Sequence, residues 1–228
     1  MKLSIRPVLG AEVGLSLMLM QMAAHHQITP ELVVCDLAIS HSVYGRDRLL
    51  DQVALARTNH EPFFEENLNI WNYSTSLANL VAFLYLIQFK SAPCIPLISF
   101  ISNGYAKSKT FLGPAKSVVI GALWAYAIVF IPPDSAPDDL FLVYSSIYSA
   151  VSNIADIKDI EEDKLNEVNT IPVLLGEKNS YIVSSVLAGL AIATHHTTPL
   201  IDSWTVGDTL IEFVSAIVFV YASLMSFG

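Results

Sequence analysis

Three aspartates in the second half of the chain have the residue type and the spacing for metal or phosphate chemistry. They are Asp156, Asp159 and Asp163, and they follow an apolar run over residues 141–154. On a helix, at about 100° per residue, offsets of three and seven keep the three carboxylates within one narrow arc. Carboxylates this close raise one another's pKa unless a cation lies between them. Clustered oxygen ligands suit a hard ion such as Mg²⁺, which keeps some waters and shares phosphate oxygens of a substrate.

A plainer interpretation of the same aspartates is a solvated acidic helix end, with Lys158 and Lys164 as nearby partners. The position of the cluster at the mouth of an apolar segment favours function, because acids at a membrane are energetically costly. Both interpretations stay open at the level of these residues alone.

The composition is that of a membrane protein. The chain has 228 residues, of which 53% are hydrophobic and 14% are charged, and its mean hydropathy is +0.52. A soluble domain carries about a quarter charged residues. The length allows one domain over residues 1–228, and the net charge of −9 argues against a nucleic-acid partner.

Apolar segments recur along the chain at lengths that approach a membrane crossing, which needs about 20 residues. They predict an all-α, polytopic membrane helix bundle with about eight transmembrane helices. The expected helices cover residues 7–24, 30–51, 70–89, 92–103, 117–131, 140–154, 180–194 and 209–227.

A second pair of acids ends the expected helix over 30–51. Asp47 and Asp51 are spaced four residues apart, and Arg46 directly precedes them. Taken alone, this pattern is typical of a helix end with local charge pairs between residues three or four apart.

Basic and phenolic side chains gather between residues 104 and 116, namely Tyr105, Lys107, Lys109 and Lys116. Ammonium groups and a phenol are good partners for phosphate oxygens. The alternative is anchoring at the cytoplasmic face, which needs lysines but no chemistry.

The distribution of basic residues predicts the orientation in the membrane. With a cytoplasmic N-terminus and eight helices, eleven of the twelve Lys and Arg residues fall on the cytoplasmic side, and Lys90 falls opposite. Both aspartate clusters and the loop that contains Tyr105 then lie on this same face. We therefore expect a multi-pass protein whose motif loops share the cytoplasmic or equivalent face of a membrane that the sequence does not identify.

The opening motif also resembles a specific family. Asp156, Asp159 and Asp163, followed by the run from Thr170 to Val173 (Thr-Ile-Pro-Val) and by Gly176, are similar to the second aspartate-rich motif of the UbiA-type intramembrane prenyltransferases. In that family the first motif is usually N-D-x-x-D-x-x-x-D on the second helix. Asp47 and Asp51 match its last two aspartates, whereas Val43 and Tyr44 stand where the family has Asn and Asp. Family members usually have nine helices, and eight are counted here.

The resemblance implies a function. Mg²⁺ ions would bridge the diphosphate of an allylic isoprenoid to Asp47, Asp51, Asp156, Asp159 and Asp163. The diphosphate would also bind Arg46, Tyr105, Lys107 and Lys109, and the isoprenyl group would pass to an aromatic or other lipophilic acceptor held between the helices. Two alternatives are an intramembrane terpene cyclase and a catalytically inactive homologue that binds lipid diphosphates. A small transporter fits less well, because it would not require the acids and the Thr-Ile-Pro-Val run together.

Overall fold

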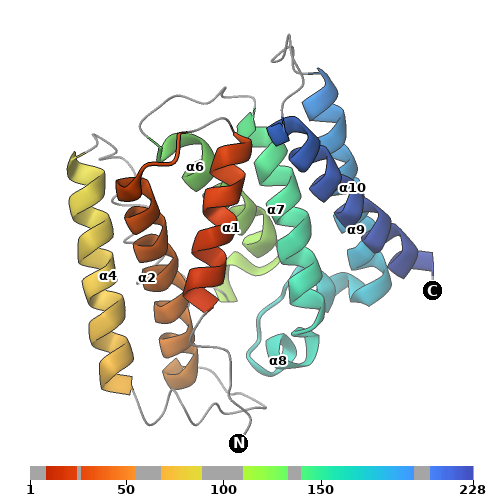
Figure 1. The fold of residues 1–228 in the computed structure, drawn as a ribbon. Helices are drawn as coiled ribbons and strands as arrows, with labels where there is room; N and C mark the ends of the chain where they lie inside the picture. Colours follow the sequence, from red (N-terminus) through yellow and green to blue (C-terminus); the bar gives the residue numbers. More distant parts are fainter. Residues whose placement is uncertain are drawn as a thin grey trace, which may run out of the picture. The chain divides into compact units, whose positions relative to one another are not determined.

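The computed structural model describes residues 9–24, 27–54, 68–88, 110–132, 140–197 and 206–227 (Figure 1). Within these ranges the chain forms helices and no strand, as the sequence predicts. The helices are α1 (Leu9–Ala23), α2 (Pro30–Ala54), α4 (Leu68–Gln88), the 3₁₀ turn η2 (Gly113–Ala115), α6 (Lys116–Phe130), α7 (Leu140–Ile157), α8 (Ile160–Leu165), α9 (Ile171–Thr197) and α10 (Val206–Phe227). The expected segment 92–103 lies outside the described residues.

Three helices are long and apolar enough to cross a membrane within the described part of the chain. They cover Leu68–Ile87, Thr110–Phe130 and Leu140–Ile157. Many of the large apolar side chains on α4 are exposed, among them Ile70, Leu77 and Leu84. Such a face suits contact with lipid. The count of eight spans and the side on which each loop lies stay predictions.

The chain divides into two compact units, which are described separately. Unit 1 comprises residues 1–19 and 27–108, and unit 2 comprises residues 20–26 and 109–228. The prediction of a single domain over 1–228 stays a prediction.

In unit 1, α2 packs on α4. His41 shares a hydrogen bond with the Ser74 hydroxyl, with 3.1 Å between Nε2 and Oγ. Gly45 provides a close approach, since a Cβ at this position would lie 2.6 Å from the side chain of Thr75. Small residues permit this kind of tight helix pairing, which is common in membranes.

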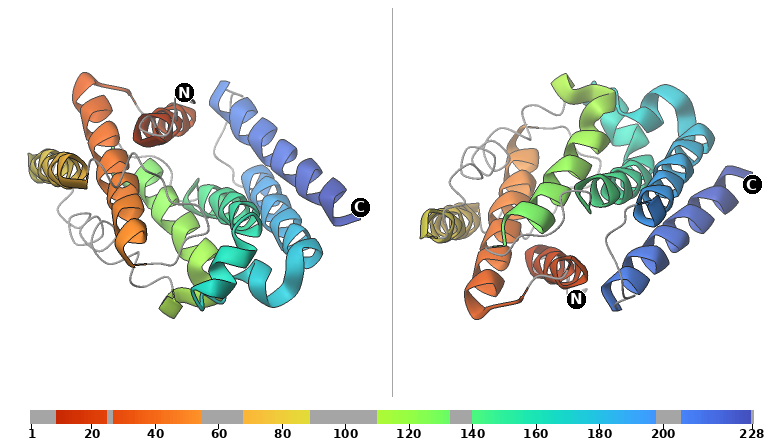
Figure 2. Two further views of the ribbon diagram at one scale, coloured as in Figure 1. Left: turned by 90° about the horizontal axis from the view of Figure 1, so that it is seen from below. Right: turned by 90° about the horizontal axis from the view of Figure 1, so that it is seen from above.

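In unit 2, α7 lies between α6 and α9, and α10 packs on the far side of α9, as both views in Figure 2 show. A Cβ on Gly121 of α6 would lie 2.1 Å from the Ser149 hydroxyl oxygen on α7 and 2.5 Å from the Ser145 carbonyl oxygen. The two helices therefore pack backbone to backbone at this point. Their contact fixes the register that brings the start of α6 next to the end of α7.

A buried asparagine joins α7 to α9. The Asn153 amide donates to the Ser180 carbonyl oxygen at 2.8 Å and to the Ser184 hydroxyl at 2.9 Å. The Ser184 hydroxyl in turn donates to the Ala150 carbonyl oxygen at 3.2 Å. Polar links of this kind help to specify which faces of two apolar helices meet, because the hydrophobic effect does not distinguish one apolar face from another in lipid.

Candidate functional site

The first aspartate of the opening motif lies on the last turn of α7. The helix is longer than the sequence predicts, because it continues past residue 154 to Ile157 and so includes Asp156. Beyond it the backbone tightens into a turn, in which the Asp159 N–H donates to the Asp156 carbonyl oxygen at 3.1 Å. Asp156 is therefore held by a regular helix and not by a loop.

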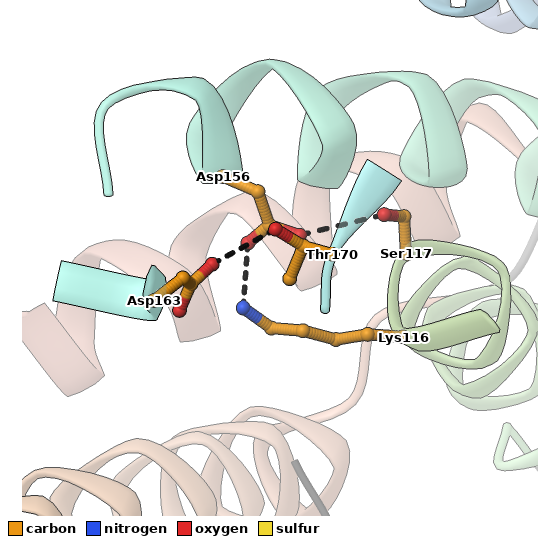
Figure 3. Close-up of polar contacts among 5 residues, drawn as sticks. All are labelled: Lys116, Ser117, Asp156, Asp163 and Thr170. Atoms are coloured by element: carbon orange, nitrogen blue, oxygen red, sulfur yellow. Dashed lines mark hydrogen bonds and ion pairs between the residues drawn. The ribbon is translucent and has the colours of Figure 1, made fainter. Parts of the chain in front are cut away.

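Asp156 is buried and pairs with a lysine from the neighbouring helix. The Lys116 ammonium donates to Asp156 Oδ1 at 2.7 Å, and the two side chains are only 9% and 6% exposed. The Ser117 hydroxyl donates to Asp156 Oδ2 at 3.4 Å (Figure 3). Both partners come from the first turn of α6, at the register that the Gly121 contact sets. Burying a charged pair is energetically costly unless its hydrogen bonds are satisfied, and here both carboxylate oxygens have a donor.

The third aspartate, Asp163, lies on the short helix α8 and is also buried. The Thr170 hydroxyl donates to Asp163 Oδ2 at 3.0 Å (Figure 3). The backbone reinforces this arrangement, since the Val168 N–H donates to the Asp163 carbonyl oxygen at 2.9 Å. Glu167 adopts a positive φ of 56°, which reverses the chain between the two partners. The connection from Asp163 to Thr170 thus forms a closed loop.

The pKa of the Asp163 carboxyl is raised above its usual value. Burial is the largest cause, and the charges of Asp156 and Asp159 add to it. The charge of Lys116 and the hydrogen bond from Thr170 act in the opposite direction, but they do not outweigh the burial. Asp163 therefore lies in an environment that disfavours its own negative charge until further positive charge arrives.

Asp159 differs from the other two aspartates. It occupies the N-cap position of α8 without a side-chain capping hydrogen bond, and its side chain is exposed. The prediction of three carboxylates in one narrow arc assumed a single continuous helix. The helix instead ends between Asp156 and Asp159, so the three do not share one helical face.

The Thr-Ile-Pro-Val run forms the start of α9. Thr170 precedes the helix and is fully buried, and its carbonyl oxygen accepts the Leu174 N–H at 3.0 Å. Pro172 lies in the first turn, where its missing N–H has no helical partner to lose. Gly176 interrupts the helix with φ 78° and ψ 167°, a conformation that only glycine adopts readily. The first residue of the run, Thr170, therefore holds the Asp163 side chain, and the kink at Gly176 follows shortly after the run ends.

The oxygen-only donors of this cluster suit a hard cation, but their arrangement does not form a three-carboxylate metal site. Across the ranges that the structure describes, no three His, Cys, Asp or Glu side chains gather closely enough to hold a metal ion. Asp156 is already paired with Lys116, and Asp159 is exposed. The metal role predicted for the three aspartates stays a prediction.

The remaining predicted residues are only partly described. Asp47 and Asp51 lie on α2 by their backbone, and their side chains lie outside the description. Arg46 donates a hydrogen bond to the side-chain oxygen of Asn72 on α4, within unit 1. Tyr105, Lys107 and Lys109 lie outside the described residues.

Lys116, Ser117 and Thr170 are not among the predicted site residues, although Thr170 begins the Thr-Ile-Pro-Val run that the resemblance includes. Lys116 was grouped with the basic residues of its loop, although it is the one that begins an apolar helix. A lysine at the start of an apolar helix is rarely buried unless it is paired with an acid. This position was the available signal for a buried ion pair. Thr170 is marked only by the motif run that it begins, and Ser117 carries no such signal, since isolated hydroxyl residues are common in apolar helices.

The described residues thus define a class: an all-helical, strongly apolar protein with a buried cluster of lysine, aspartate and threonine at one end of a potential membrane span. Over 41 residues the chain is 46% identical to a digeranylgeranylglyceryl phosphate synthase from Sulfolobus acidocaldarius. The match covers 18% of this chain and 15% of that protein. No protein-family model matches the chain, and no solved structure matches it significantly.

Proposed function

We propose that the chain is an intramembrane prenyltransferase of the UbiA type, which moves an isoprenyl group from an allylic diphosphate to a lipophilic acceptor. The observation that carries the proposal is the buried cluster of Lys116, Asp156, Asp163 and Thr170 at the end of a helix that is apolar enough to cross a membrane. An ionisable group in such a position suggests a functional site, because placing its charge within a bilayer costs free energy.

The short match supports prenyl transfer as the general class. The name of the relative describes a product with two geranylgeranyl groups on glyceryl phosphate. A synthase of that product must form a bond between a geranylgeranyl group and a glycerol-based lipid. For this chain the acceptor is proposed only as lipophilic, with an aromatic compound and a glycerol lipid as the two candidates.

The proposed reaction begins with ionisation. The bond between C1 of the isoprenyl group and the diphosphate oxygen breaks, and its electron pair leaves with the diphosphate. The acceptor then forms a bond to the C1 cation and loses a proton to the released diphosphate. Preorganised donors stabilise the charge that develops in such a step. The Lys116 ammonium would stabilise the negative charge on the leaving diphosphate in this way. An apolar surrounding would keep water from the cation.

Mg²⁺ belongs to the proposal as the ion that the acidic motifs would bind. When bound, a divalent cation neutralises the charge of a leaving diphosphate. The described aspartates do not by themselves form a three-carboxylate site for the ion. Its requirement is tested separately.

The test is transfer from radiolabelled geranylgeranyl diphosphate by the purified protein in lipid nanodiscs. Geranylgeranylglyceryl phosphate and a phenolic acid serve as acceptors, with Mg²⁺ or with EDTA. Asp163→Asn removes a carboxylate that the motif would offer to Mg²⁺ and should lower the rate by about a hundredfold, the order of loss seen when one group that stabilises a transition state is removed. Glu161→Gln is the matched control, since Glu161 lies on the same helix but is 82% exposed and pairs with the exposed Lys164. It should leave the rate unchanged.

The same assay separates the rivals. Diphosphate release with a cyclic hydrocarbon as the product would identify a terpene cyclase. Binding of the diphosphate without release, by protein that is folded, would identify an inactive lipid-diphosphate binder. The pairing of Asp156 with Lys116 in place of a metal is the observation that keeps this last rival in consideration.

A further inference from the structure

The ammonium of Lys116 supplies positive charge to the two buried carboxylates of the second aspartate motif, Asp156 and Asp163. It contacts Asp156 at 2.7 Å, and its charge also acts on Asp163. Figure 3 shows the lysine side chain extending from α6 toward both carboxylates, with Thr170 beside them. The pair is buried, so water screens it far less than it screens a surface pair.

Asp156 is the less available of the two buried carboxylates for a metal ion, because both of its oxygens already accept a hydrogen bond. One oxygen of Asp156 accepts from Lys116 and the other from Ser117, while Asp163 accepts from Thr170. Within the described part of the chain no set of three acids is arranged for a metal. An incoming divalent cation at Asp156 would have to lie next to an ammonium, and like charges at such a distance repel strongly in a buried setting.

We propose that Lys116 is the resident cation of this motif: its ammonium takes the place at Asp156 that one divalent cation would otherwise fill, and it excludes metal from Asp156 while the pair is intact. The inference concerns the same site as the proposed function and rests on it for the expectation that a divalent cation reaches the motif. A motif that carries its own ammonium needs one metal ion fewer to receive a diphosphate, and Lys116 meets the phosphate oxygens in that ion's place.

The test is Mn²⁺ binding to the purified protein in detergent, followed by the electron paramagnetic resonance signal of free Mn²⁺, without any isoprenoid. Lys116→Gln removes the charge but keeps a hydrogen-bond donor for Asp156. It should raise Mn²⁺ affinity by about tenfold or more, because a repelling charge at contact distance is lost. The gain should vanish in Lys116→Gln/Asp156→Asn, which removes the freed carboxylate. Lys116→Arg should bind Mn²⁺ as the wild type does.

Lys164→Gln is the matched control. Lys164 also pairs with an acid, Glu161, at 2.9 Å, but the two side chains are 52% and 82% exposed. Losing this charge should change Mn²⁺ affinity by less than about twofold, because solvent screens an exposed pair. An equal gain in Lys116→Gln and Lys164→Gln would overturn the proposal, since the effect would then be one of net charge.

A second arm does not depend on whether Lys116→Gln folds. In the wild-type background, Asp156→Asn should leave Mn²⁺ affinity unchanged, because Asp156 is not available to the metal. A large loss of Mn²⁺ binding in Asp156→Asn would overturn the proposal, and so would a Lys116→Gln protein that binds no more Mn²⁺ than the wild type. A gain in Lys116→Gln by a protein that transfers no isoprenyl group would uphold the lysine's role and reject only the transferase.

Discussion

The hydroxyl of Thr170 donates to Asp163 at 3.0 Å, and both residues are buried. Seven positions separate them, and the loop between them closes through the hydrogen bond from the Val168 N–H to the Asp163 carbonyl oxygen. The threonine of the Thr-Ile-Pro-Val run therefore orients one of the motif's own aspartates. This gives the spacing between the aspartates and that run a physical reason.

Replacing Thr170 with valine tests this relationship. Valine keeps the shape of threonine but removes the donor, so the buried carboxylate loses a hydrogen bond worth about 1.5–3 kcal/mol when the acceptor is charged. We expect the free energy of unfolding at neutral pH to fall by an amount of that order. Thr170→Ser, which keeps the hydroxyl, is the control in a denaturation series in detergent. Equal stability of the valine and serine variants would show that the bond is unimportant.

The raised pKa of Asp163 predicts how stability changes with pH when EDTA removes divalent ions. Because the folded state favours the protonated carboxyl, the contribution of Asp163 is fully present below its unfolded pKa of about 3.9 and is lost as pH rises through the raised folded pKa. Asp163→Asn resembles the protonated form at every pH. We expect wild type and variant to unfold at similar temperatures near pH 4, and the wild type to fall below the variant toward pH 7. An unfolding temperature of the wild type that rises relative to that of the variant as pH increases would contradict this prediction.

Adding Mn²⁺ or Mg²⁺ to the same pair of proteins extends the measurement. A cation that binds the ionised Asp163 carboxylate stabilises only the wild type. The difference in unfolding temperature between the wild type and Asp163→Asn should therefore narrow or reverse at neutral pH. If the ion has the same effect on both proteins, Asp163 is not one of its ligands.

Gly121→Ala should disrupt the contact between α6 and α7. The added Cβ would lie 2.1 Å from the Ser149 hydroxyl oxygen and 2.5 Å from the Ser145 carbonyl oxygen. Overpacking of this kind costs about 1–3 kcal/mol. Trimming Ser149 to alanine as well should not restore stability, because backbone atoms are also too close. Gly189→Ala is the control, since its Cβ would meet only Phe219 at 3.5 Å and alanine favours the helix by about 1 kcal/mol.

Asn153→Ala should weaken the pairing of α7 with α9. The amide spans the two helices through Ser180 and Ser184, and links of this kind contribute about 0.6–2 kcal/mol in a membrane. A cysteine pair introduced across the two helices would report the change as slower or less complete cross-linking. Asn179→Ala is the control, because Asn179 is exposed and donates to Leu175 on its own helix.

The sequence predicts much of this architecture because its signals are local. The apolar run that begins near residue 140 predicts α7, and Leu140 is its first residue. The prediction ends this helix too early, because Asp156 is polar, although Ile154, Ala155 and Ile157 continue a helical pattern. Pro172 is a good signal for the first turn of a helix, but the resemblance drew attention to the run as a motif, and α9 was expected to begin at residue 180.

The pairing of Lys116 with Asp156 could not be predicted in the same way. The two residues are 40 positions apart, and their contact depends on the register of α6 against α7. That register depends on Gly121, whose missing side chain leaves no positive signal in a sequence. The role of Thr170 is similar, because a buried hydroxyl is recognisable only when its partner is known.

Gly176 divides α9 into two helical segments that meet at a kink. Its φ of 78° breaks the helix, yet a Cβ there would meet no atom of the described residues within 4 Å. The short segment from Ile171 to Leu175 follows the loop that holds Asp163, while the long segment is joined to α7 through the hydrogen bonds of Asn153. A larger residue would fit the space at this position but would be strained by the positive φ. The backbone torsion, and not the available volume, therefore favours glycine here.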